Sequence, residues 1–169
     1  MLEPQYLATL RIIHGHLRER GLNWALTGSC SFALQGMPVD VHDIDIQTDE
    51  HGVYAIARLL ARYVARPVAF SRSERIQSHL GVLEVEGVRV EIMGALSKRL
   101  PDGAWEPPVN PADHVCFVEV EEMRLPVLDL AYEYTAYLTL GRHERAELLG
   151  QWLLARNAPG SGTLEENSN

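Results

Sequence analysis

A short acidic pattern, Asp43-Ile44-Asp45, is the feature of this chain best suited to chemistry. Side chains alternate between the two faces of a β-strand, so the two carboxylates would lie together on one face and the isoleucine on the other. Two adjacent carboxylates repel each other at neutral pH unless a proton or a cation lies between them. Oxygen ligands in a small cluster suit Mg²⁺ or Mn²⁺ better than zinc. The pattern therefore predicts a metal site.

A third carboxylate, Glu91, is predicted on the same surface by the register of a hairpin. Residues 80–93 alternate on both sides of Glu86-Gly87, which is typical of a two-residue turn. With that turn, the apolar residues of both strands share one face and Glu91 lies on the other. A one-residue bulge would reverse this placement. Carboxylate clusters of this kind hold metals that stabilise the attacking and leaving oxygens in phosphoryl transfer.

The pair Gly28-Ser29 precedes the acidic pattern by about 14 residues and is a candidate phosphate-binding turn. Residues 23–27 predict a short buried strand, and residues 30–35 predict a short helix with Ser29 as its N-cap. Backbone N–H groups at a helix start can bind phosphate, Gly28 allows a close approach, and the Ser29 hydroxyl adds a donor. A Gly-Ser pair alone commonly only caps a helix, but its spacing from Asp-x-Asp favours a nucleotide site.

Hydrophobic periodicity predicts the elements that must position these residues. Helices are expected at residues 3–20, 30–35, 50–64, 128–140 and 143–156. Strands are expected at residues 23–27 and 43–48 and in hairpins at 80–93 and 115–127, with a long irregular loop over 94–113. Strands that occur both in hairpins and between helices favour a mixed sheet with helices packed on it, an α+β (mixed α/β) fold.

Length and charge limit the alternatives. The 169 residues suffice for one domain, expected over residues 1–156, with residues 157–169 as a disordered tail. A formal net charge of −8 argues against nonspecific binding along a nucleic-acid backbone, but it permits the binding of one nucleotide together with a cation. No apolar run reaches the ~20 residues of a membrane span, and no secretory signal is visible. A cytoplasmic location is therefore expected.

Together these segments resemble the signature of the nucleotidyltransferase superfamily that includes DNA polymerase beta. Within it, the chain looks closest to small bacterial nucleotidyltransferase-domain proteins, which are similar to the aminoglycoside and lincosamide nucleotidyltransferases. The resemblance reaches from the N-terminal region to about Leu154. It rests on Leu26-Thr27-Gly28-Ser29, Phe32-Ala33-Leu34-Gln35-Gly36, His42-Asp43-Ile44-Asp45-Ile46 and Val88-Arg89-Val90-Glu91-Ile92-Met93.

The resemblance implies a nucleotidyltransferase fold with C-terminal helices. It also implies transfer of a nucleoside monophosphate from an NTP, such as ATP, to an acceptor hydroxyl, with release of pyrophosphate. By position, Gly28 and Ser29 would bind the triphosphate, and Asp43 and Asp45 would hold Mg²⁺ or Mn²⁺. Glu91 would ligate the catalytic metal or accept the proton of the acceptor, although relatives more often have Asp there.

One departure from the family pattern concerns the positive charge that faces the triphosphate. Many relatives carry a Lys shortly before the Gly-Arg of a late helix, and this chain has none before Gly141-Arg142. Arg142 and Arg75 are the expected nucleotide-binding substitutes, and Arg72 and Lys98 are further candidates. If none of them substitutes, NTP binding should be weak or the activity lost.

The alternative to an enzyme is a non-catalytic nucleotide-binding or protein-interaction module on the same fold. The missing Lys and the absence of a substantial second domain, which would form an acceptor wall, both favour it. A homodimer would weaken this alternative, because a second chain could complete the pocket. For the enzyme, the acidic charge makes a small-molecule acceptor a better expectation than a long polynucleotide.

Overall fold

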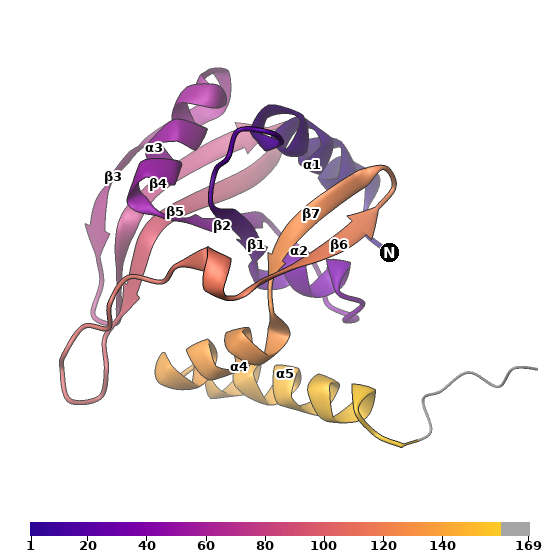
Figure 1. The fold of residues 1–169 in the computed structure, drawn as a ribbon, viewed down its shortest axis with the longest axis vertical. Coiled ribbons are helices and arrows are strands. Elements are labelled where there is room, and N and C mark those ends of the chain that lie inside the picture. The colour runs from indigo at the N-terminus through magenta and orange to yellow at the C-terminus, as the bar shows by residue number, and fades with distance from the viewer. Residues whose placement is uncertain (160–169) are drawn as a thin grey trace, which may run out of the picture.

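A seven-stranded mixed sheet forms the centre of the fold in a computed structural model that describes residues 1–159 (Figure 1). The strand order is β3-β4-β5-β2-β1-β7-β6. The pairs β2–β5 and β1–β7 are parallel, and the other neighbouring pairs are antiparallel. The strands are β1 (Trp24–Thr27), β2 (Ile44–Thr48), β3 (Val64–Arg72), β4 (Ile76–Val85), β5 (Val88–Lys98), β6 (Val115–Val120) and β7 (Met123–Leu128).

Helices cover the sheet and extend below it, which confirms the predicted α+β class (Figure 1). The main core lies between the sheet and the helices α1 and α3. A smaller apolar cluster joins α2 to α4 and α5, which pack against each other. Within residues 1–159, no helix has both the length and the apolar character needed to cross a membrane. The helices are α1 (Pro4–Leu17), α2 (Gly28–Leu34), α3 (Glu50–Leu59), α4 (Leu130–Thr139) and α5 (His143–Arg156), with 3₁₀ turns η1 (Ala61–Tyr63) and η2 (Pro111–Asp113).

Alternation along β2 decides which of its side chains leave the core. Ile44 and Ile46 are completely buried in the main core, as expected for the apolar face of the strand. Asp45 and Gln47 point to the opposite face and are only partly buried. The strand therefore directs its carboxylate away from the core because its isoleucines must face it.

The β4–β5 hairpin has the predicted register. Val85 lies opposite Val88, and the chain reverses at Glu86-Gly87, with φ of 51° and 77°. Positive φ at both central residues is the type I′ geometry that matches the twist of the flanking strands. No bulge intervenes between the turn and the pair Val82–Glu91, so Glu91 leaves the core on the predicted face.

Two predicted segments were wrong. The helix expected over residues 50–64 ends at Leu59, and the chain continues through η1 into β3. Pro67 lies within β3, where it is tolerated because β3 is an edge strand with a register shift between Arg66 and Ala69. The loop expected from Gly94 begins later, because β5 extends to Lys98.

Gly94 explains the second of these errors. A Cβ atom at Gly94 would lie 2.5 Å from Cγ1 of Val53, so this glycine permits close packing of α3 on β5. At the C-terminus, α5 ends at the predicted Arg156. The predicted tail lies largely outside the described residues, which end at residue 159.

Candidate active site

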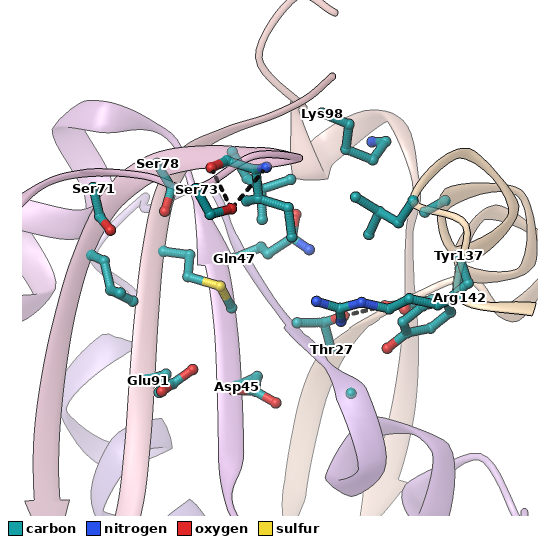
Figure 2. Close-up of a pocket in the computed structure, with 18 of the residues that line it drawn as sticks. Thr27, Asp45, Gln47, Ser71, Ser73, Ser78, Glu91, Lys98, Tyr137 and Arg142 are labelled. Carbon is teal, nitrogen blue, oxygen red and sulfur yellow. Dashed lines mark hydrogen bonds between the residues drawn. The ribbon is translucent and has the colours of Figure 1, made fainter. Parts of the chain in front are cut away.

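Three carboxylates emerge on one face of the sheet from neighbouring segments. Asp43 immediately precedes β2, and Asp45 lies two residues further along the same backbone. Because β2 and β5 are parallel neighbours, Asp45 is the register partner of Glu91. Figure 2 shows Asp45 and Glu91 side by side on the two strands. The structure thus brings these three residues together, as strand alternation predicted.

The three carboxylates do not form a closed cluster in this structure. Oε1 of Glu91 accepts a hydrogen bond from Nη2 of Arg89 at 2.7 Å. Among residues 1–159, no group of three or more His, Cys, Asp or Glu side chains is arranged to hold a metal ion.

Burial and like charge raise the pKa of Asp45 to about 7. Loss of water around the carboxyl is the largest cause, followed by repulsion from Asp43 and then from Glu91. Arg145 and Arg89 act in the opposite direction but do not offset these effects. The carboxyl of Asp45 therefore retains its proton far above the usual range unless further positive charge is brought to it.

The turn at which α2 begins lies directly against Asp45. Gly28 has a φ of +71°, a left-handed conformation that favours glycine. A Cβ atom at Gly28 would lie 2.5 Å from Oδ2 of Asp45, closer than any real Cβ contact. Glycine at this position therefore allows both the turn and its contact with the carboxylate.

The predicted N-cap role of Ser29 was wrong. The helix α2 begins two residues earlier than predicted, at Gly28, and Thr27 occupies the N-cap position without a side-chain capping hydrogen bond. The hydroxyl of Thr27 instead donates a hydrogen bond to Oε1 of Glu133 in α4. Ser29 is partly buried in the first turn of α2 and, unlike Gly28, does not line the cavity described below.

A cavity of about 360 Å³ opens above these groups (Figure 2). The sheet supplies one wall, and α4 with the connection that follows it supplies the other. The sheet wall includes Asp45, Gln47, Glu91 and Met93, and the helical wall includes Tyr132, Glu133, Tyr137 and Arg142. The space therefore connects Asp45 and Glu91 to a surface made by α4 and the residues that follow it.

Two basic residues considered as counter-charges line this cavity. Arg142 extends into it from the helical wall, as Figure 2 shows. Lys98 lies at the far end, where its Nζ is 3.3 Å from the hydroxyl of Tyr132 and 3.3 Å from Oε2 of Glu106. Lys98 is thus already paired, whereas Arg142 is exposed and faces the cavity.

Arg75 and Arg72 are placed outside this cavity. Nη1 of Arg75 donates a hydrogen bond to the carbonyl oxygen of Leu140 at 3.1 Å, just beyond the C-terminal end of α4. Carbonyl groups at a helix end attract a cation, which gives Arg75 a local structural partner. The guanidinium of Arg72 lies over the Trp105 ring, 5.4 Å from its centroid.

Glu133 is a site residue that the sequence did not indicate as functional. Its carboxyl is 3% exposed, and burial raises its pKa to about 7 although the hydrogen bond from Thr27 acts against the shift. The sequence feature that could have indicated Glu133 is its position in the hydrophobic pattern of α4. Glu133 is an acidic residue in phase with the buried Leu130 and Tyr137 on an otherwise apolar helical face.

The raised pKa values of Asp45 and Glu133 predict that the metal-free protein becomes less stable as the pH rises. Both groups bind protons more tightly in the folded than in the unfolded chain, so between about pH 4 and 7 the folded state holds more protons. The free energy of unfolding should therefore fall across this range, by on the order of 2–4 kcal/mol.

Urea unfolding in the presence of a chelator at pH 5 and pH 8 would measure this difference. A variant that combines Asp45→Asn with Glu133→Gln removes both groups and should show a much smaller difference. Equal unfolding free energies of the unsubstituted protein at the two pH values would contradict the prediction.

The chain is similar in sequence and structure to nucleotidyltransferases. Residues 9–149 match the sequence model of the aminoglycoside-2''-adenylyltransferase family. A Thermotoga maritima protein that is provisionally classed as a nucleotidyltransferase is 54% identical, with a TM-score of 0.81. The alignment covers 92% of this chain and 97% of that protein. Among curated protein sequences, none matches the chain.

Two antibiotic-modifying enzymes share the fold at lower identity. The lincosamide antibiotic adenylyltransferase LnuA, solved with lincomycin, is 18% identical with a TM-score of 0.53, over 89% of this chain and 97% of LnuA. ANT(2'')-Ia, solved with adenylyl-2''-tobramycin, is 12% identical with a TM-score of 0.55, over 90% of each chain. At these identities the likeness supports the fold alone.

Proposed function

Because the chain belongs to the aminoglycoside-2''-adenylyltransferase family, and thus to the nucleotidyltransferases, we propose that it transfers a nucleoside monophosphate from an NTP to a hydroxyl of a small-molecule acceptor. The observation that carries the proposal is the convergence of Asp43, Asp45 and Glu91 beside the Gly28 turn. In this reaction the acceptor oxygen forms a bond to the α-phosphorus, and the bond from that phosphorus to the pyrophosphate oxygen breaks. ATP is the first candidate donor, as the family name suggests.

The donor set fits Mg²⁺ or Mn²⁺. Asp43, Asp45 and Glu91 offer only oxygen ligands, which these hard cations prefer. The raised pKa of Asp45 reflects negative charge that lacks a nearby partner, and a divalent cation would relieve it. When bound, such a cation supplies positive charge to the phosphate oxygens during transfer.

Other residues of the site would bind the triphosphate and accept the proton of the acceptor. The backbone N–H groups of the Gly28-Ser29 turn would bind phosphate oxygens of the NTP. Arg142, which lines the cavity, would supply the positive charge that relatives obtain from a Lys. Glu91 would accept the proton of the acceptor hydroxyl or ligate the cation. Arg75 is no longer a favoured phosphate ligand, because it contacts the carbonyl of Leu140.

An enzyme is favoured over a non-catalytic module for two reasons. The family and the 54% identical relative are nucleotidyltransferases by classification. The cavity is lined by Asp45, Glu91 and the exposed Arg142, so the missing Lys does not leave the site without positive charge. The cavity volume of about 360 Å³ and the net charge of −8 support a small acceptor over a polynucleotide.

Calorimetric titration with each of the four common NTPs tests the proposal. At least one should bind in the presence of Mg²⁺, and chelation of the metal should weaken that binding. Incubation with that NTP and a pool of metabolites, followed by mass spectrometry, should then yield a product heavier by one nucleotidyl group. Failure of all four NTPs to bind, or binding that is equally tight with EDTA, would refute the proposal.

A further inference from the structure

Glu133 is a buried carboxyl with no role in the transfer proposed above. It projects from α4 toward the end of β1, where Oε1 accepts the hydrogen bond from the Thr27 hydroxyl. Its side chain is among the few charged groups that the fold buries, at 3% exposure. Thr27 is the residue immediately before Gly28, so Glu133 binds a side chain directly next to the turn.

The hydrogen bond joins two parts of the molecule with different cores. The turn and β1 belong to the central sheet, whereas α4 and α5 pack in the smaller cluster with Phe32 of α2. The Thr27 hydroxyl does not cap α2 and donates its hydrogen bond to Glu133 instead. Glu133 therefore supplies a polar link between the C-terminal helices and the turn.

A carboxyl is an unfavourable choice for this position if packing alone matters. Removing a carboxyl from water costs free energy, and the repulsion between Glu133 and Asp45 adds to that cost. Lys98 and Arg145 only partly offset these effects, so the pKa of Glu133 remains raised to about 7. An apolar residue in phase with Leu130 would avoid this cost but could not accept the hydrogen bond from Thr27.

We infer that Glu133 is a positioning residue that holds the Thr27–Gly28 turn against Asp45 through the Thr27 hydroxyl. Gly28 contacts the Asp45 carboxylate, so a shift of Thr27 would change the separation between the turn and the carboxylates. The phosphates of an NTP would have to contact the turn and the cation held by the carboxylates at the same time. The expected effect of Glu133 on nucleotide affinity rests on the proposed function. Its effect on the position of the turn does not.

Two measurements on the full chain test this inference, namely ATP affinity with Mg²⁺ and amide hydrogen exchange of residues 27–31. Glu133→Ala and Thr27→Val should each weaken ATP binding about tenfold, equivalent to one lost hydrogen bond of about 1.4 kcal/mol. Combining them should weaken it no further, because both remove the same bond. Glu133→Gln keeps an acceptor oxygen and should stay within about threefold of the unsubstituted protein. Exchange at residues 27–31 should rise about tenfold in the first two variants.

Thr135→Val, on the exposed side of α4, is the matched control and should leave both measurements unchanged. Additive losses in the double variant, or unchanged exchange at residues 27–31 in Glu133→Ala, would overturn the inference. Loss of affinity in Glu133→Gln equal to that in Glu133→Ala would overturn it too, since a hydrogen-bond acceptor would then not be sufficient. If the unsubstituted protein binds no NTP, the proposed function fails, and the exchange data still decide whether Glu133 holds the turn.

Discussion

Replacing Asp45 with asparagine is expected to abolish nucleotidyl transfer and yet raise the free energy of unfolding of the metal-free protein at pH 8. The loss of transfer should be about 10³-fold or more, because positive charge held by the carboxylates contributes several kcal/mol to such reactions. The gain in stability should be about 2 kcal/mol. The two effects have opposite signs and the same origin.

That origin is the environment of the carboxyl. Asp45 is largely removed from water beside Asp43 and Glu91, so ionisation in the folded protein is costly until a cation arrives. Asparagine has nearly the same shape but no charge to ionise, and it cannot replace an anionic ligand. Binding of an NTP with Mg²⁺ and urea unfolding with a chelator would measure the two effects separately.

Asp40→Asn makes the same chemical change at an exposed position shortly before β2, and it should alter neither transfer nor stability appreciably. A variant Asp45→Asn that retained more than a tenth of the activity would show that this carboxylate is not a metal ligand. A variant that unfolded more easily at pH 8 would show that the ionised carboxyl stabilises the fold.

The face on which the carboxylates lie was predictable because it depends on local rules. Strand alternation has a period of two, and the turn at Glu86-Gly87 sets the hairpin register without reference to the rest of the chain. Asp45 and Glu91 followed from those two facts. The sequence could not specify that Glu91 would point to Arg89, since that contact depends on the rotamers of two flexible side chains.

The segments that were missed depend on tertiary contacts. Proline and glycine are both disfavoured inside a strand, but an edge position tolerates Pro67 and the close packing of α3 on β5 requires Gly94. Similarly, a helical pattern placed Glu133 on the apolar face of α4 without indicating what that face would meet. Its partner Thr27 lies in a distant part of the sequence, and only the fold brings the two together.

The surroundings of the basic residues could not be predicted from the sequence for a related reason. Arg75 and Arg142 come together near the end of α4, and charge alone does not distinguish a residue that binds a backbone carbonyl from one that faces the cavity. Arg145, which lowers the pKa of both Asp45 and Glu133, is the third residue of α5, and its position in the sequence does not show that it lies near these carboxyls. A long basic side chain can contact several different groups from one backbone position. Which group it contacts therefore depends on how the helices and strands pack.

Replacing Gly28 with alanine is expected to reduce transfer about 100-fold or more while lowering the free energy of unfolding by only about 1–2 kcal/mol. The backbone cost arises because alanine disfavours a φ of +71°. The larger functional effect arises because the new Cβ would lie 2.5 Å from Oδ2 of Asp45, so the turn or the carboxylate must move. A displacement of about 1 Å between reacting groups can lower a rate by about 10²-fold.

Gly21→Ala separates these two causes. Gly21 has a similar φ of +66°, but a Cβ there would meet nothing within 4 Å. This variant should therefore lose a similar amount of stability in urea unfolding and keep both NTP affinity and transfer. Equal activities in Gly28→Ala and Gly21→Ala would mean that the turn adapts to a side chain. A selective loss in Gly28→Ala would instead mean that the separation between turn and carboxylate is what the site requires, the same separation that Glu133 is inferred to maintain.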